Sequence, residues 1–186
     1  MRYLCLSIFV VFFIGCNRYL DKKSETNKTV INKDYEFTIL ESKNIFKYKS
    51  PVYLKKDSEV VLTTLFEIDL PKKMVNFEIS NMAEFSFYYS SRQCIFISND
   101  NEKKSVVKND TFYIPSQNEL NIFINNYSKG SFKNNLKNNK ILRDRRFCFF
   151  KRKNSTILLY NIQTNNFNYF LNSIKSLIVP ARSGCS

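Results

Sequence analysis

The chain has 186 residues, with 29 Lys and Arg against 16 Asp and Glu, so its formal net charge is +13. It contains 18 Phe, 11 Tyr and no Trp, and 44% of its residues are hydrophobic, which is enough for one packed core. It has no His, which excludes Ser-His-Asp and Cys-His catalysis, HExxH metalloprotease centres and His-ligated metal sites within this chain.

The N-terminus has the features of a secretory signal peptide. Arg2 is followed by an apolar run from Leu4 to Ile14. That run is about half the 20 residues that a membrane-spanning helix requires. A hydrophobic edge strand is the structural alternative. The preceding charge and the abrupt change to polar sequence after Cys16 favour a signal peptide over residues 1–15.

The end of this run carries a specific resemblance. Phe13-Ile14-Gly15-Cys16 resembles the lipobox of bacterial lipoproteins, in which an aliphatic residue, a small residue, and Gly or Ala precede the cysteine. Phe13 departs from the usual Leu at its position. The resemblance implies cleavage after Gly15, a diacylglyceryl group on the sulfur of Cys16, and acylation, for example with palmitate, of the new amino group. It covers residues 1–16 and implies nothing about the rest of the chain.

If Cys16 is lipidated, the protein is a membrane-anchored protein of the bacterial cell envelope. Residues 16–33 are polar, charged and without period, so we expect a lipidated N-terminus and a flexible tether there. No acidic run resembling the surface-export signal of some lipoproteins follows Cys16, which favours the periplasmic face.

The following segments alternate apolar and polar residues with the period of strands. Residues 58–71 also fit a helix entered through Ser58, but their β-branched residues and Pro71 favour a strand. The predicted strands are residues 35–42, 58–71, 74–80, 84–90, 92–98 and 111–115, and a hairpin over 145–162 that turns at Lys151 to Asn154.

Two amphipathic helices are predicted. Ser116 and Glu119 form a capping box before apolar residues at helical spacing, which places one helix at about 117–128. Thr164 can cap the second, at about 165–178, which ends before Pro180. Strands followed by helices indicate the α+β class. We expect an antiparallel sheet of short strands with both helices packed on one face, a single domain over 34–180, and a frayed tail at 181–186.

The cysteines after Cys16 lack the spacing of a metal site, and no metal or cofactor is expected. Cys94 and Cys148 each lie in a strand-like apolar run. We hypothesise a Cys94–Cys148 disulfide, which the envelope compartment would permit. The alternative is two buried thiols that behave as small apolar side chains.

Few residues suggest a catalytic or ligand-binding role. Glu67 and Asp69 share a side of a predicted strand and could serve acid–base catalysis on a glycan, although two acids on a solvated strand face are the simpler interpretation. A second segment is rich in cations and could bind an anionic headgroup or glycan, or it could keep the apolar "FCFF" run from aggregating. Its residues are Arg143, Arg145, Arg146, Lys151, Arg152 and Lys153.

The sequence therefore predicts a lipid-anchored envelope protein that acts as a non-catalytic binding or structural accessory module. Its expected partners are membrane lipid and either another envelope protein or an anionic envelope polymer. No nucleic-acid partner is expected, because no nucleic-acid-binding motif is present. The alternatives are a carboxylate-dependent hydrolase of envelope glycans and a secreted, unanchored binding protein.

Overall fold

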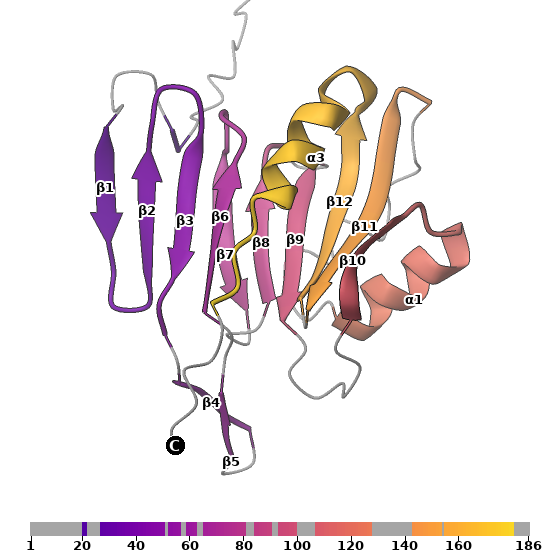
Figure 1. Cartoon of the computed structure of the whole chain (residues 1–186). Helices are drawn as coiled ribbons and strands as arrows, with labels where there is room; N and C mark the ends of the chain where they lie inside the picture. Colours follow the sequence, from indigo (N-terminus) through magenta and orange to yellow (C-terminus); the bar gives the residue numbers. More distant parts are fainter. Residues whose placement is uncertain are drawn as a thin grey trace, which may run out of the picture.

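The computed structural model describes residues 20–21, 27–50, 52–56, 59–62, 65–80, 84–90, 93–99, 107–127, 143–153 and 155–180. Within these ranges the chain is mostly β, with antiparallel sheets and two short α-helices, so the α+β prediction is confirmed in coarse form (Figure 1). Cys16 and the predicted tail at 181–186 lie outside the described residues.

Three antiparallel sheets form in the described chain. The first has the order β1-β2-β3-β6, with bounds Lys28–Ile31, Tyr35–Ile39, Asn44–Tyr48 and Phe66–Leu70. The second has the order β10-β11-β12-β9-β8-β7, with bounds Val107–Tyr113, Arg145–Lys153, Ser155–Gln163, Cys94–Asn99, Glu84–Tyr88 and Asn76–Ser80. The third is the hairpin of β4 (Val52–Lys56) and β5 (Glu59–Leu62).

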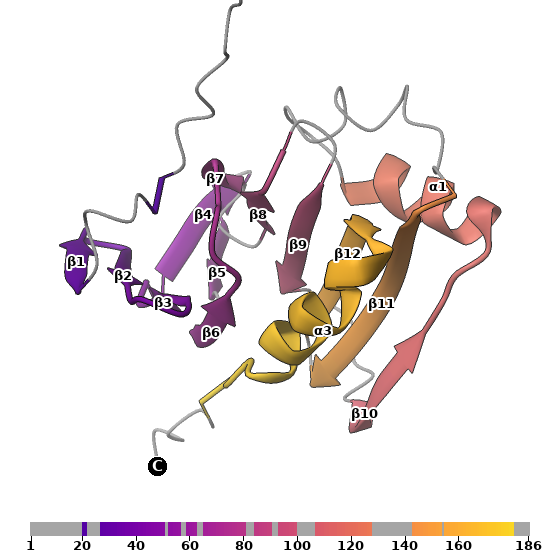
Figure 2. The same cartoon turned by 90° about the horizontal axis from the view of Figure 1, so that it is seen from above.

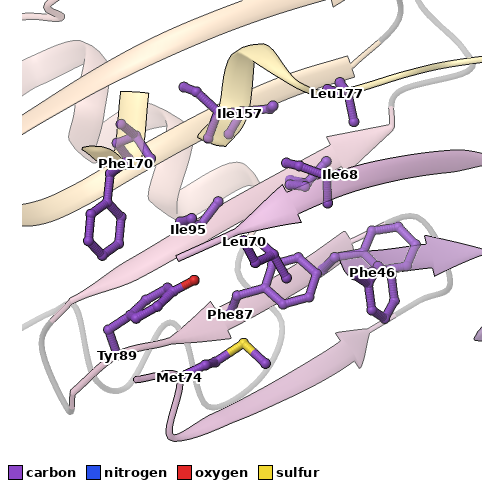
Figure 3. Close-up of a cluster of buried hydrophobic side chains, with 14 of the residues drawn as sticks. Phe46, Ile68, Leu70, Met74, Phe87, Tyr89, Ile95, Ile157, Phe170 and Leu177 are labelled. Carbon is purple, nitrogen blue, oxygen red and sulfur yellow. The ribbon is translucent and has the colours of Figure 1, made fainter. Parts of the chain in front are cut away.

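The core lies between the four-stranded sheet and one face of the six-stranded sheet (Figure 3). Phe46 of β3 is fully buried, and its ring lies 5.0 Å from that of Phe87 and 5.6 Å from that of Phe77. Phe66 packs edge-on against Phe85 at 4.7 Å. These aromatic contacts join the two sheets, because strands β3 and β6 alternate buried and exposed residues along their length.

Helix α3 (Phe167–Lys175) covers the rest of that same face. Phe170 and Ile174 are buried in the core with Ile95, Ile157 and Leu159 of the sheet. The chain after the helix runs beside β6, where Glu67 and Ile178 exchange backbone hydrogen bonds. Helix α3 and the four-stranded sheet therefore share one layer of the molecule.

Helix α1 (Gln117–Tyr127) covers the opposite face of the six-stranded sheet, as Figure 2 shows from above. Its Leu120 and Ile124 pack against Phe96, Phe149 and Leu158, which alternate along their strands with the residues facing α3. The prediction that both helices pack on one face is therefore wrong. Strands β9, β11 and β12 are apolar on both faces, so each face requires its own cover.

The N-terminal boundary of the domain was also predicted wrongly. Residues 28–31 form β1, which pairs with β2 over four register positions. The backbone N–H of Leu20 donates to the carbonyl of Met74 at 2.7 Å, and Asp21 is buried. Residues 20–21 and 27–33 therefore belong to the folded domain, not to a flexible tether over 16–33.

Two local predictions need smaller corrections. The predicted strand over 58–71 is two strands, since β5 pairs with β4 and β6 pairs with β3. The predicted hairpin is β11 and β12, with a register shift between Arg146 and Cys148. Asn161 lies near this shift and has φ 56, the left-handed region in which Asn is tolerated.

Candidate functional site

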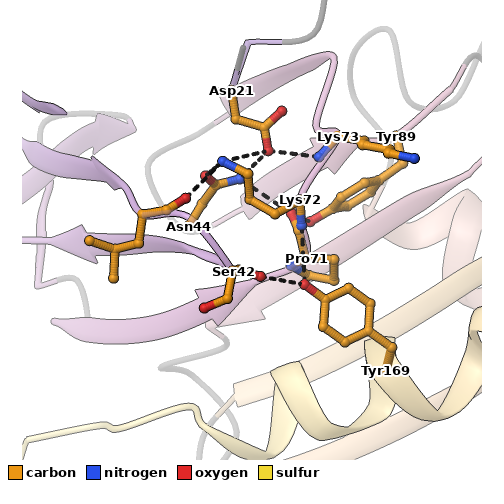
Figure 4. A network of polar contacts seen from close by, with 9 residues as sticks. Asp21, Ser42, Asn44, Pro71, Lys72, Lys73, Tyr89 and Tyr169 are labelled. Carbon is orange, nitrogen blue, oxygen red and sulfur yellow. Dashed lines mark hydrogen bonds and ion pairs between the residues drawn. The ribbon is translucent and has the colours of Figure 1, made fainter. Parts of the chain in front are cut away.

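Cys16, the predicted lipidation residue, lies four positions before Leu20, where the described chain begins. Leu20 and Asp21 dock on the turn between β6 and β7, at the end of the molecule where β3 starts and β6 ends. We call the polar network that holds them the Asp21 junction, and define it as Asp21, Asn44, Pro71, Lys72 and Lys73 (Figure 4).

The Asp21 carboxylate is the centre of the junction, and its side chain is fully buried. Its Oδ2 accepts a hydrogen bond from Asn44 Nδ2 at 2.7 Å and one from the backbone N–H of Lys73 at 2.7 Å. Lys72 Nζ lies 3.7 Å from the same oxygen. A buried carboxylate is stable only when it is paired and hydrogen-bonded, so these three partners are what allow Asp21 to enter the domain.

The partners of Asp21 are themselves held in place. Asn44 Nδ2 also donates to the carbonyl of Pro71 at 3.2 Å, and Lys72 Nζ donates to the carbonyl of Leu40 at 2.9 Å. Lys73 has φ 66, the left-handed region that a non-glycine residue enters only at a cost. Its backbone N–H bond to Asp21 compensates for that conformation.

Two tyrosines flank the Asp21 junction, one on the side of the core and one on the side of α3. Tyr89 is buried and donates its hydroxyl to the carbonyl of Pro71 at 3.1 Å. Burial, followed by the negative charge of Asp21, raises the pKa of Tyr89 well above its usual value, so this hydroxyl stays protonated. Tyr169 of α3 donates to the carbonyl of Ser42 at 2.9 Å. The junction thus connects both sheets and α3 to the first described residues of the chain.

Sequence reasoning missed the Asp21 junction. Asp21 lies in a segment of charged residues without hydrophobic period, where an acid is normally solvated. Its partners come from positions far along the chain, such as Asn44 and Lys73. No local pattern in the sequence marks it.

The structure does not bring the predicted cationic residues together. Strand β11 begins with Arg145 and Arg146, just after Arg143. It ends with Lys151, Arg152 and Lys153, roughly 20 Å away at the rise of a strand. Lys151 Nζ lies 5.5 Å from the ring centre of Tyr113, and the guanidinium of Arg146 lies 5.8 Å from that of Phe167.

Arg152 is a structural residue. Its guanidinium makes hydrogen bonds to both carboxylate oxygens of Asp110 on β10, the shortest at 2.6 Å. It also donates to the carbonyls of Lys175 and Leu177 at the end of α3. Arg152 therefore joins an edge strand to the helix terminus, and its hydrogen bond lowers the pKa of Asp110.

The predicted Cys94–Cys148 disulfide is wrong. Both residues are free, buried thiols. Cys94 on β9 packs with the cluster under α1, whereas Cys148 on β11 packs with the core under α3. Strand β12 separates them, which places their Cα atoms about 10 Å apart, beyond the reach of a disulfide. Burial raises the pKa of Cys148 to about 12 and that of Cys94 well above its usual value.

The two candidate catalytic carboxylates lie on the outer face of β6, partly buried. Asp69 Oδ2 accepts from Lys43 Nζ at 2.6 Å, and Glu67 lies opposite Lys47 in the register of β3 and β6. This cross-strand pattern of acids and lysines is typical of a solvated sheet face.

In the part of the chain that the structure describes, no three His, Cys, Asp or Glu residues cluster so as to hold a metal ion. No helix there has the length and apolar character needed to cross a bilayer. Comparisons with protein-family models, with curated proteins and with solved structures found no match to this chain.

Proposed function

We propose that this chain is a bacterial lipoprotein of the cell envelope, anchored through Cys16, whose domain acts as a non-catalytic binding or structural accessory. The observation that carries the proposal is the position of the Asp21 junction. The first described residue, Leu20, is already bound to the domain, and it lies four positions after the cysteine of a segment that resembles a signal peptide and lipobox. A chain that docks its first residues so close to the cleavage point is suited to hold a domain at a membrane.

The energetics of acylation support stable anchoring. Each buried methylene contributes about 0.8 kcal/mol, and two or more acyl chains give stable membrane attachment where one does not. Acylation at Cys16 would supply these chains. The net positive charge of the chain after cleavage also favours a position at the membrane, because a basic protein is attracted to anionic phospholipid.

The absence of catalysis is supported by the state of the buried ionisable groups. The thiols of Cys94 and Cys148 have raised pKa values and stay protonated at neutral pH, so neither is an activated nucleophile. The Asp69 carboxylate forms an ion pair with the Lys43 ammonium on the outer face of the four-stranded sheet. The domain is therefore proposed to act on another envelope protein or an anionic envelope polymer by contact.

Metabolic labelling with an alkyne-bearing palmitate tests the proposal. We expect the full chain expressed in a bacterium to incorporate the label and to fractionate with membranes. The Cys16→Ala variant should lose both properties. The Cys5→Ala variant is the matched control, because Cys5 lies in the same apolar run and should not affect labelling. Equal labelling of the Cys16→Ala variant and the parent chain would refute the proposal.

A further inference from the structure

The short sequence separation between Cys16 and the first docked residue, Leu20, limits which surface of the domain could face a membrane. Cys16 and Leu20 are separated by four peptide units, which span at most about 14 Å when fully extended. If Cys16 carries the acyl chains, the surface around Leu20 lies within that distance of the lipid headgroups. Docking at Leu20 therefore places the first described contact of the domain much closer to Cys16 than a flexible tether over 16–33 would have done.

Three apolar or aromatic side chains are exposed on the segments that meet at the turn between β6 and β7. Leu20 is 38% exposed, Val75 is 36% exposed and Tyr169 is 45% exposed. All three lie on or against this turn. Val75 belongs to the turn, the backbone N–H of Leu20 donates to the carbonyl of Met74, and the hydroxyl of Tyr169 accepts from the backbone N–H of Lys72. We define the turn patch as Leu20, Lys72, Lys73, Val75 and Tyr169.

Among the described residues around the turn patch, the charges largely cancel. Lys72 is paired with Asp21, and Lys43 beside it is paired with Asp69. Lys73 is exposed, as is Glu41 in the neighbouring turn between β2 and β3. The described residues of this surface therefore offer a bilayer mainly apolar side chains and the phenol ring of Tyr169, a side chain that favours the interfacial region.

Resting on the proposed lipid anchor, we propose that the turn patch contacts the phospholipid headgroup layer of the membrane in which Cys16 is acylated. Leu20, Val75 and Tyr169 enter the interface, and Lys73 lies at the level of the phosphates. The opposite end of the four-stranded sheet, at the turn between β1 and β2 that contains Lys33, points away from the bilayer.

Depth-dependent fluorescence quenching tests this orientation on the lipidated chain reconstituted in phosphatidylcholine vesicles. An environment-sensitive dye is attached through Lys73→Cys or Lys33→Cys, each in a Cys185→Ser background, and quenched by a headgroup spin label. Both positions are exposed, and the turns that carry them lie at opposite ends of the strands. We expect quenching at position 73 to exceed that at position 33 several-fold and to persist in 0.5 M salt, about five times the ionic strength that gives a 10 Å Debye length.

A second variant tests whether the contact with the headgroups depends on the short segment between Cys16 and Leu20. Insertion of twelve Gly and Ser residues between Asn17 and Arg18 leaves every described contact intact but lengthens the reach by at most about 40 Å. We expect this insertion to reduce quenching at position 73 towards that at position 33. Intact mass is measured on the same samples.

The outcomes separate the two proposals. Equal quenching at positions 73 and 33 in a chain that carries the acyl mass overturns the orientation and leaves the lipid anchor standing. A chain without acyl mass overturns both. Quenching at position 73 that disappears in salt overturns the apolar contact, because it would show attraction by charge alone.

Discussion

The backbone N–H of Lys73 donates to the buried carboxylate of Asp21 at 2.7 Å, across 52 positions of sequence. Lys73 has the left-handed φ of 66, so the acid both fixes a costly turn and secures the start of the domain. The bond links the residues nearest the proposed anchor to the turn between the two large sheets. The Asp21 side chain, together with the backbone bond from Leu20 to Met74, therefore holds the first described residues on the domain.

Replacement of Asp21 by Ala is expected to lower the free energy of unfolding by about 2–4 kcal/mol. The substitution leaves Asn44 Nδ2, the N–H of Lys73 and the ammonium of Lys72 without their shared acceptor. Urea denaturation followed by circular dichroism measures the change. Asp144→Ala is the matched control, because its side chain is 71% exposed and should change the value by less than about 0.5 kcal/mol. Equal losses for the two variants would contradict the role of Asp21.

Stability is expected to fall at alkaline pH because of the buried thiol of Cys148. Its pKa is raised from 9.0 to about 12 by burial. A raised pKa contributes stability that is present below pH 9 and lost as the pH rises towards 12. The slope for one such group reaches about 1.4 kcal/mol per pH unit.

Urea denaturation between pH 8.5 and 10.5, at roughly half-unit intervals across the thiol range, measures this slope. We expect the Cys148→Ala variant to have a shallower slope than the parent chain. Ile97→Val, which also removes volume from the core, should keep the parent slope while lowering stability throughout. Parallel slopes for all three chains would show that Cys148 is not the titrating group.

Replacement of Arg152 by Lys is expected to destabilise the fold by about 1–2 kcal/mol although the charge is retained. A lysine cannot bond both oxygens of Asp110 and also the carbonyls of Lys175 and Leu177. Thermal unfolding measures the loss. Arg146→Lys is the control, since the guanidinium of Arg146 lies over the ring of Phe167 and Lys can occupy the same place. A loss at Arg146 as large as that at Arg152 would argue against the helix-terminus role.

Replacement of Ser116 by Ala is expected to cost about 1 kcal/mol of stability. The Ser116 hydroxyl accepts from the backbone N–H of Glu119 at 3.3 Å, and the Glu119 carboxylate accepts from the N–H of Ser116 at 2.7 Å. The backbone N–H of Ser116, followed by its hydroxyl, which also lies 2.8 Å from the Glu119 carboxylate, lowers the pKa of Glu119. Ser116→Thr should retain most of the stability in the same denaturation assay. An Ala variant as stable as the parent chain would show that the cap does not matter.

Local patterns predicted most of the secondary structure. The alternation in residues 35–42 and 74–80 and the capping box at Ser116 specify structure through neighbouring residues, and strands β2 and β7 and helix α1 lie within these predicted ranges. The opposite placement of α1 and α3 also had a signal, because the continuous apolar runs "FCFF" and "ILLY" indicate strands buried on both faces.

Features that depend on distant residues could not be predicted. The pairing of β6 with β3, the separation of Cys94 from Cys148 by β12, and the burial of Asp21 all follow from tertiary register. A strand pattern specifies its two faces but not its neighbours. The separation of the cationic residues has a different cause, because they lie at the two ends of strand β11 and the rise of the strand keeps its ends apart.

We propose that Cys16 begins the mature chain and carries its lipid. Intact-mass spectrometry of the protein extracted from bacterial membranes tests this proposal. We expect a chain that starts at Cys16 and carries the added mass of a diacylglyceryl group, with or without a further acyl group on its amino terminus. An unmodified chain that retains Met1 would contradict it.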